Sequence, residues 1–154
     1  HTYRLKCAEG KPFEFEVLHT PGHARGHLCF YDRERGFLLS SDNVVGEGTV
    51  VIAPPEGNMS DYMESLKRMR GLPNLRFLCG SHGTAVSDAQ GKIDEYLNHR
   101  TERENQILRT VRRVGTDPRM IAAEVYDGLD PKIVPLAVKT VEAHLAKLKF
   151  EGRL

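Results

Sequence analysis

The sequence predicts an α+β fold, in which short strands dominate up to residue 81 and helices follow from residue 87. Apolar side chains alternate through residues 13–19, as in a strand with one buried face. Residues 26–31 and 37–40 have the pattern of a hairpin that turns at 32–36. Residues 75–79 predict a further short buried strand.

Helical spacing marks the segments between and after these strands. Ser60 is a candidate N-cap for a helix that ends at 71–73. Its expected inward face is Tyr62, Met63, Leu66 and Met69. The pair Ser87-Asp88 is expected to cap a long helix that runs past Arg113 and has a polar interval at 98–105. A helix that loses its apolar stripe midway bridges two packing units, so we predict domains at 1–100 and 101–154.

Two amphipathic helices are predicted in the second domain, at 118–126 and 135–150. The inward stripe expected for the last helix is Leu136, Val141, Leu145 and Leu148. Three helices that close on residues 152–154 predict a small helical domain.

Candidate ligands follow three of the predicted strands. The stretch 18–27 reads Leu-His-Thr-Pro-Gly-His-Ala-Arg-Gly-His, and its Pro-Gly pair leaves His23 at the tip of a turn. Asp42 and His82 each follow an apolar run in the same way. Imidazole and carboxylate are ligands that zinc prefers, so the three residues predict one metal site. The alternatives are that His23 caps a turn and that Asp42 forms an Asx-turn.

These motifs carry a resemblance to a known family. TPGH at 20–23, SD at 41–42 and GSHG at 80–83 resemble the second half of a metallo-β-lactamase superfamily hydrolase domain. The tail from YLNHR at 96–100 to EGRL at 151–154 is similar to one subgroup. That subgroup comprises β-lactamase-like hydrolases with a C-terminal winged helix, including a single-strand-specific endoribonuclease.

The resemblance implies half of an αββα sandwich, followed by a winged-helix-like domain whose wing is truncated. It implies that His23 binds one metal ion, His82 the other, and that Asp42 bridges them. Two zinc ions are expected, although His and Asp suit manganese and iron as well. The family's His-x-His-x-Asp-His motif lies upstream, and only His1 stands before His19 here. The chain is therefore expected to lack half of the ligands.

The implied activity is hydrolysis of an ester, thioester or phosphodiester by a metal-bound hydroxide, which the metal ligands hold. The expected substrate is a small ester or thioester, or single-stranded RNA, and the isolated chain is expected to be inactive. Two positions depart from the family pattern. Ser41 stands where glycine is common, and Gly80-Ser81 stand where Pro-Gly is common. Both affect turn geometry without removing a ligand.

Further polar residues have two interpretations each. His27, His99 and Arg100 would contact substrate or support the ligands, or else be a structural histidine and a solvated helix face. The basic residues of the long helix would contact phosphate or simply be solvated: Arg100, Arg103, Arg109, Arg112 and Arg113. The alternative function is therefore a module that binds nucleic acid or a protein through the winged helix.

Composition restricts location and partners. A net charge of +1 neither favours nor excludes a polyanionic partner, and no apolar run approaches the roughly 18 residues of a membrane span. Cys7, Cys29 and Cys79 form no Cys-x-x-Cys pair, which indicates a reducing, cytoplasmic location. The chain starts at His1 without Met, so we expect a piece of a longer protein. Its exposed sheet is expected to pair with the missing N-terminal half or with a second copy.

Overall fold

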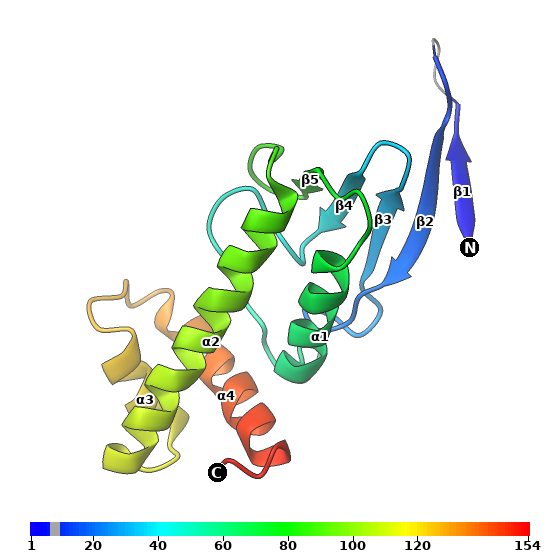
Figure 1. Ribbon diagram of the computed structural model, residues 1–154. Helices are drawn as coiled ribbons and strands as arrows, with labels where there is room; N and C mark the ends of the chain where they lie inside the picture. The colour runs from blue at the N-terminus through cyan, green and yellow to red at the C-terminus, as the bar shows by residue number, and fades with distance from the viewer. Residues whose placement is uncertain (7–9) are drawn as a thin grey trace.

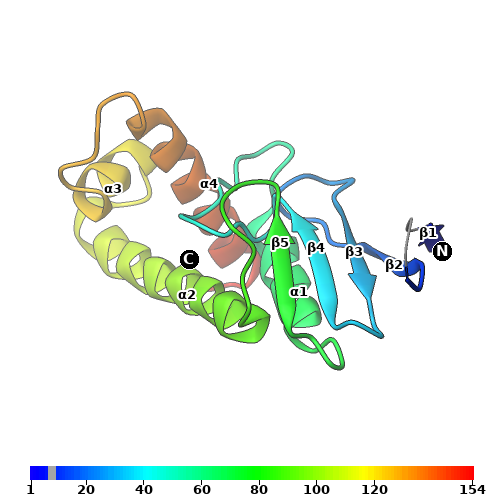
Figure 2. The same ribbon diagram turned by 90° about the horizontal axis from the view of Figure 1, so that it is seen from above.

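The computed structural model describes residues 1–6 and 10–154. It contains a mixed sheet and a group of helices beside it (Figures 1 and 2). The elements in chain order are β1 (Thr2–Leu5), β2 (Phe13–His19), β3 (Leu28–Asp32), β4 (Phe37–Ser41), α1 (Met59–Arg70), β5 (Phe77–Gly80), α2 (Ala89–Val114), α3 (Pro118–Val125) and α4 (Val134–Phe150). The predicted α+β class is confirmed.

The sheet has the strand order β1-β2-β3-β4-β5. The first four strands are antiparallel neighbours, and β5 returns through α1 to lie parallel to β4. The predicted hairpin of β3 and β4 is confirmed, with Phe30 opposite Leu39. The outer strand β1 was not predicted. All four of its residues are exposed, so it carries no burial alternation that a sequence pattern could reveal.

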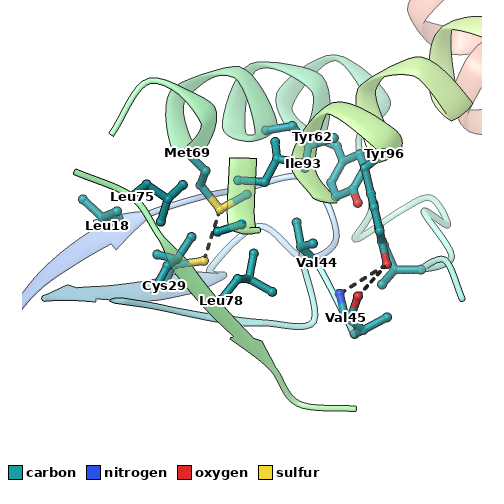
Figure 3. Close-up of a cluster of buried hydrophobic side chains, with 14 of the residues drawn as sticks. Leu18, Cys29, Val44, Val45, Tyr62, Met69, Leu75, Leu78, Ile93 and Tyr96 are labelled. Atoms are coloured by element: carbon teal, nitrogen blue, oxygen red, sulfur yellow. Dashed lines mark hydrogen bonds between the residues drawn. The ribbon is translucent and has the colours of Figure 1, made fainter. Parts of the chain in front are cut away.

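One face of the sheet and helices α1 and α2 enclose the main core (Figure 3). The sheet contributes Cys29 and Leu78, and the helices contribute Leu66 and Ile93, all fully buried. The predicted inward face of α1 is confirmed. Its N-cap is not Ser60, however, but Asn58. The side-chain oxygen of Asn58 accepts hydrogen bonds from the backbone amides of residues 60 and 61 at 2.9 and 3.1 Å.

The opposite face of the sheet is open. Figure 2 looks onto it, with β3 to β5 in front of α1. Tyr3, Leu5 and Leu28 keep 60%, 57% and 42% of their surface exposed. A hollow of about 530 Å³ lies at the β1–β3 end, where Val17 and Phe30 also line it. The side chains around this hollow are mainly apolar.

Helix α2 links the main core to a second, smaller one. Its first half buries Ile93 and Tyr96, and its second half packs with α3 and α4 around Ile107, Ile121, Ala122, Val141 and Leu148. The polar interval at 98–105 still has a buried face, because Arg100 and Glu104 are only 2% and 8% exposed. Helix α4 also reaches the main core through Ala143.

The predicted stripe of α4 is partly wrong. Val141 and Leu148 are buried, but Leu136 is 47% exposed. Leu136 lies five residues before Val141, about 140° around the helix, so both cannot face the same neighbour. Buried Ala137 and His144 complete the inward face instead. After α2 the structure has helices only, and the winged-helix assignment and the boundary near residue 100 stay predictions.

Two further sequence features are located by the structure. Cys29 is fully buried and Cys79 partly buried, while Cys7 lies outside the described residues. Across residues 1–6 and 10–154, every helix is too short or too polar to cross a membrane.

Candidate metal centre

The turn that carries His23 is held against the start of α1. Gly22 has a φ of +134°, and a Cβ there would lie 2.2 Å from the Cα of Tyr62, so only glycine fits. The amide of Asn58 donates to the Gly22 carbonyl at 2.8 Å, and the Ser65 hydroxyl donates to the Pro21 carbonyl at 2.6 Å. These contacts fix the backbone of the turn.

The ring of His23 is in the tautomer that suits metal binding through Nε2. Its Nδ1 lies 3.0 Å from the carbonyl oxygen of Val51. A carbonyl only accepts hydrogen bonds, so Nδ1 carries the proton and Nε2 keeps its lone pair. A backbone carbonyl that orients a histidine in this way is a common feature of metal sites.

His27 lies beside His23 and is in the same tautomer. The two rings are 6.2 Å apart and nearly perpendicular. The Thr20 hydroxyl donates to the sulfur of Cys29 at 3.2 Å and must therefore accept from His27 Nδ1, 3.0 Å away. His27 Nε2 is buried and has no hydrogen-bond partner. Burial lowers the pKa of His27, nearby His23 lowers it further, and Asp42 partly opposes them.

Asp42 and His82 meet where β4 and β5 end. His82 Nε2 is 3.5 Å from Asp42 Oδ1, and the Ser81 hydroxyl donates to the same oxygen. A Cβ on Gly80 would lie 2.5 Å from the Val44 carbonyl, so this close approach requires glycine. Ser41 adopts a φ of +50°, a left-handed conformation that glycine adopts without strain. Although Ser41 replaces the glycine that is common in the family, the backbone of the turn therefore keeps the conformation that glycine would adopt.

The structure places the predicted ligands in two pairs. Asp42 contacts His82, while His23 neighbours His27, and the charge of Asp42 acts on His27. Within the described ranges, no three His, Cys, Asp or Glu side chains form a group able to hold a metal ion. The free lone pairs of His23 and His27 and the Asp42 carboxylate nevertheless suit a divalent metal. The described residues thus offer candidate metal donors but no complete metal site.

Arg100 is buried within the protein, and its neighbour His99 is half-buried. Arg100 is 2% exposed and donates to the Val50 carbonyl at 2.5 Å. The Nδ1 atom of His99 has no hydrogen-bond partner. Burial lowers the pKa of His99, and the charge of Arg100 lowers it further. These positions favour a structural or supporting role over substrate contact for Arg100.

Two polar residues that no sequence motif marks connect the pairs. The Tyr62 hydroxyl donates to the Asn43 carbonyl at 2.6 Å, and the Asn43 amide donates to the Thr20 carbonyl at 2.8 Å. In the sequence, Tyr62 is only one member of the apolar stripe of its helix. Asn43 follows Asp42 directly, and this adjacency is the one sequence signal for its role.

Comparison with known proteins identifies the family. A family model described as the metallo-beta-lactamase superfamily matches residues 3–82, more than half of the chain. The chain belongs to the metallo-beta-lactamase superfamily. All three predicted ligands of this superfamily member lie within the matched residues.

Relatives and solved structures extend the match beyond residue 82. A Drosophila melanogaster protein named beta-lactamase-like protein 2 homolog is 36% identical over 141 residues, covering 90% of this chain and 46% of that protein. An Emericella nidulans protein named atrochrysone carboxyl ACP thioesterase is 27% identical, covering 95% and 49%. The crystal structure of a metallo-beta-lactamase family protein from Thermus thermophilus is 24% identical, with a TM-score of 0.77 over 97% of this chain and 48% of that one. This superfamily member thus spans about half the length of the curated relatives that it matches.

Proposed function

We propose that this chain is the C-terminal portion of a metal-dependent hydrolase that acts on an ester or thioester. The observation that carries the proposal is that Asp42 and His82 lie 3.5 Å apart where β4 and β5 end, while His23 follows β2 with its lone pair left free by the Val51 carbonyl. A thioester is favoured among the substrates, because one relative that matches nearly the whole chain is named a thioesterase.

Two divalent ions, when bound, would supply a nucleophile at neutral pH and stabilise developing negative charge. His23 would hold one ion through its free Nε2, His82 would hold the other, and the Asp42 carboxylate would serve both. The Ser81 hydroxyl orients that carboxylate. Neutral His27 presents a buried lone pair at Nε2, which would accept a hydrogen bond from the substrate or the attacking water. Zinc is proposed for the ions, and manganese and iron share the same ligand chemistry.

The remaining ligands would come from the missing N-terminal half, packed on the open face of the sheet. Tyr3, Leu5, Leu28 and Phe77 leave a wide apolar surface on that face or its edges. Exposed apolar patches of this kind mark interaction sites. The isolated chain should therefore be inactive and associate with itself or with the supplied half. Light scattering tests this, and a monodisperse monomer would contradict it.

A nucleic-acid-binding function has less support, because three of the five arginines that the sequence singled out on α2, Arg100, Arg103 and Arg113, are engaged within the protein. Arg103 donates to the Val125 carbonyl at 2.8 Å and lies over the Tyr126 ring, and Arg113 pairs with Glu124. Each of these contacts competes with binding of phosphate. Single-stranded RNA remains a second substrate class to assay. A cytoplasmic location is part of the proposal, because the three cysteines form no Cys-x-x-Cys pair.

The experiment uses the longer protein that we propose, which includes the N-terminal half. Hydrolysis of an acyl thioester, a nitrophenyl ester and single-stranded RNA is measured for the wild type, His23→Ala and His82→Ala. Each substitution is expected to reduce turnover at least about 100-fold, since removal of a metal ligand disrupts the site. His19→Ala is the matched control, because that exposed ring hydrogen-bonds the Arg25 carbonyl and belongs to neither pair of candidate ligands. Full activity in His23→Ala would refute the assignment.

A further inference from the structure

A buried arginine lies one peptide unit away from the carbonyl that orients His23. Arg100 Nη2 donates to the carbonyl of Val50 at 2.5 Å. The next carbonyl along the chain, that of Val51, accepts the His23 Nδ1 proton at 3.0 Å. Helix α2 is therefore linked to the candidate metal ligand through two successive peptide carbonyls.

Arg100 is in an energetically costly position for a charged group. Its side chain is 2% exposed, and its Nε has no hydrogen-bond partner. No carboxylate in the described residues forms a salt bridge with it, and its planar group lies 5.4 Å from the centre of the Tyr62 ring. A buried cation that no carboxylate neutralises is costly, and an aliphatic residue would avoid that cost. Core packing alone therefore does not account for an arginine here.

The Tyr62 ring, which lies against Arg100, supports the segment that carries Asp42. Tyr62 donates its hydroxyl proton to the Asn43 carbonyl at 2.6 Å, directly after Asp42. The backbone of Tyr62 is also the surface against which Gly22 packs, immediately before His23. Arg100 and Tyr62 together thus contact the segments on both sides of the candidate metal centre.

We propose that Arg100 is a positioning residue that fixes the 50–51 peptide and thereby holds His23 in its Nδ1–H tautomer. The importance of this tautomer for metal binding rests on the proposed function. When the Val50 carbonyl loses its donor, the segment is free to rotate and the Val51 carbonyl no longer selects one nitrogen of His23. The protonated Nε2 form, which cannot bind a metal through that nitrogen, then becomes populated.

Arginine suits this role because its donors lie in a rigid plane. The lysine ammonium is a flexible point charge and would hold the carbonyl less firmly, and the glutamine amide is too short to span the same distance. The population of the Nδ1–H tautomer is therefore expected to fall in the order wild type, Arg100→Lys, Arg100→Gln, with Arg100→Met similar to Gln.

The tautomer is measured directly by nitrogen-15 NMR of the histidine rings at pH 8.5, above the usual histidine pKa, in the metal-free protein that includes the N-terminal half. The wild type should show His23 with a protonated Nδ1 and a bare Nε2, and Arg100→Met should show a mixture. Arg103→Met is the matched control. Arg103 is also on α2 and donates to a carbonyl, that of Val125, but it lies on the side of α3.

Zinc affinity by titration provides the second readout, expected to fall about 10- to 100-fold in Arg100→Met and to recover partly in Arg100→Lys. If Arg100→Met does not fold, the Lys and Gln variants decide the question. Unchanged His23 tautomer populations in every folded Arg100 variant would overturn the proposal. A wild type that binds no zinc would instead refute the proposed function, while the tautomer comparison would still test the role of Arg100.

Discussion

Replacing Glu104 by glutamine is expected to lower the free energy of unfolding by about 2 kcal/mol at pH 7, because a buried charge network loses its centre. Glu104 lies on α2, and its side chain is 10% exposed. One carboxylate oxygen is 2.7 Å from Lys147 Nζ, and the other contacts Arg153. His144 Nδ1 is 3.8 Å from the first oxygen, too far for a good hydrogen bond. The two cations therefore stabilise this carboxylate most.

The magnitude follows from the pKa. Burial raises the pKa of Glu104, but His144, Lys147 and Arg153 more than offset burial and lower it to about 2. Lowering the pKa from about 4.3 in the unfolded chain to about 2 corresponds to roughly 3 kcal/mol of stability, because each pKa unit is worth about 1.36 kcal/mol. We reduce this to about 2 kcal/mol, because Arg153 is 41% exposed and solvent screens it. A carboxyl group with a lowered pKa contributes its full stabilisation at pH values above its pKa in the unfolded chain. This contribution is lost as the pH falls towards 2.

The assay is urea unfolding of the chain at pH 7 and pH 3, at one fixed protein concentration. Glu102→Gln is the matched control, because Glu102 lies on the same helix but is exposed. The difference in free energy of unfolding between wild type and Glu104→Gln should narrow by about half or more at pH 3. Glu102→Gln should have the same free energy of unfolding as the wild type at both pH values. A Glu104→Gln gap below about 0.5 kcal/mol at pH 7, or one independent of pH, would refute the reasoning.

Two further predictions concern the site and the core. Gly22→Ala should destabilise the chain by more than about 2 kcal/mol in urea unfolding, because the new Cβ would overlap the backbone of Tyr62. Gly26→Ala, in the same loop with open space around it, should change stability by less than about 1 kcal/mol, and equal effects would contradict this account. Burial raises the pKa of the Cys29 thiol to about 11, against an opposing hydrogen bond from Thr20. Iodoacetamide at pH 8 should therefore modify Cys79 and spare Cys29 until urea is added, and peptide mass spectrometry showing early modification of Cys29 would contradict this.

The sequence predicted the elements that have a strong local signal. Strand β2 shows apolar alternation, β3 and β4 are short apolar runs on either side of a turn, and the Pro-Gly pair before His23 marks a turn that the structure confirms. The candidate ligands could be named because each follows such a strand. Their pairing could not be predicted. It depends on Ser81 reaching Asp42 and on Thr20 orienting His27, and both are contacts between segments that only the fold brings together.

The buried polar residues of α2 escaped prediction for a related reason. A pattern of apolar and polar residues assigns Arg100 and Glu104 to the surface. Their burial is made possible by the Val50 carbonyl and by Lys147, which lie 50 and 43 residues away in the chain. Long-range polar contacts of this kind leave no periodic trace in the sequence.

The central claim is that His23, Asp42 and His82 supply one side of a two-metal centre. The most direct test is the metal content of the longer protein, measured by plasma mass spectrometry for the wild type, His23→Ala and His82→Ala. The account predicts about two metal ions per chain in the wild type and fewer after each substitution. A wild type without metal, or a metal content that neither substitution changes, would contradict it.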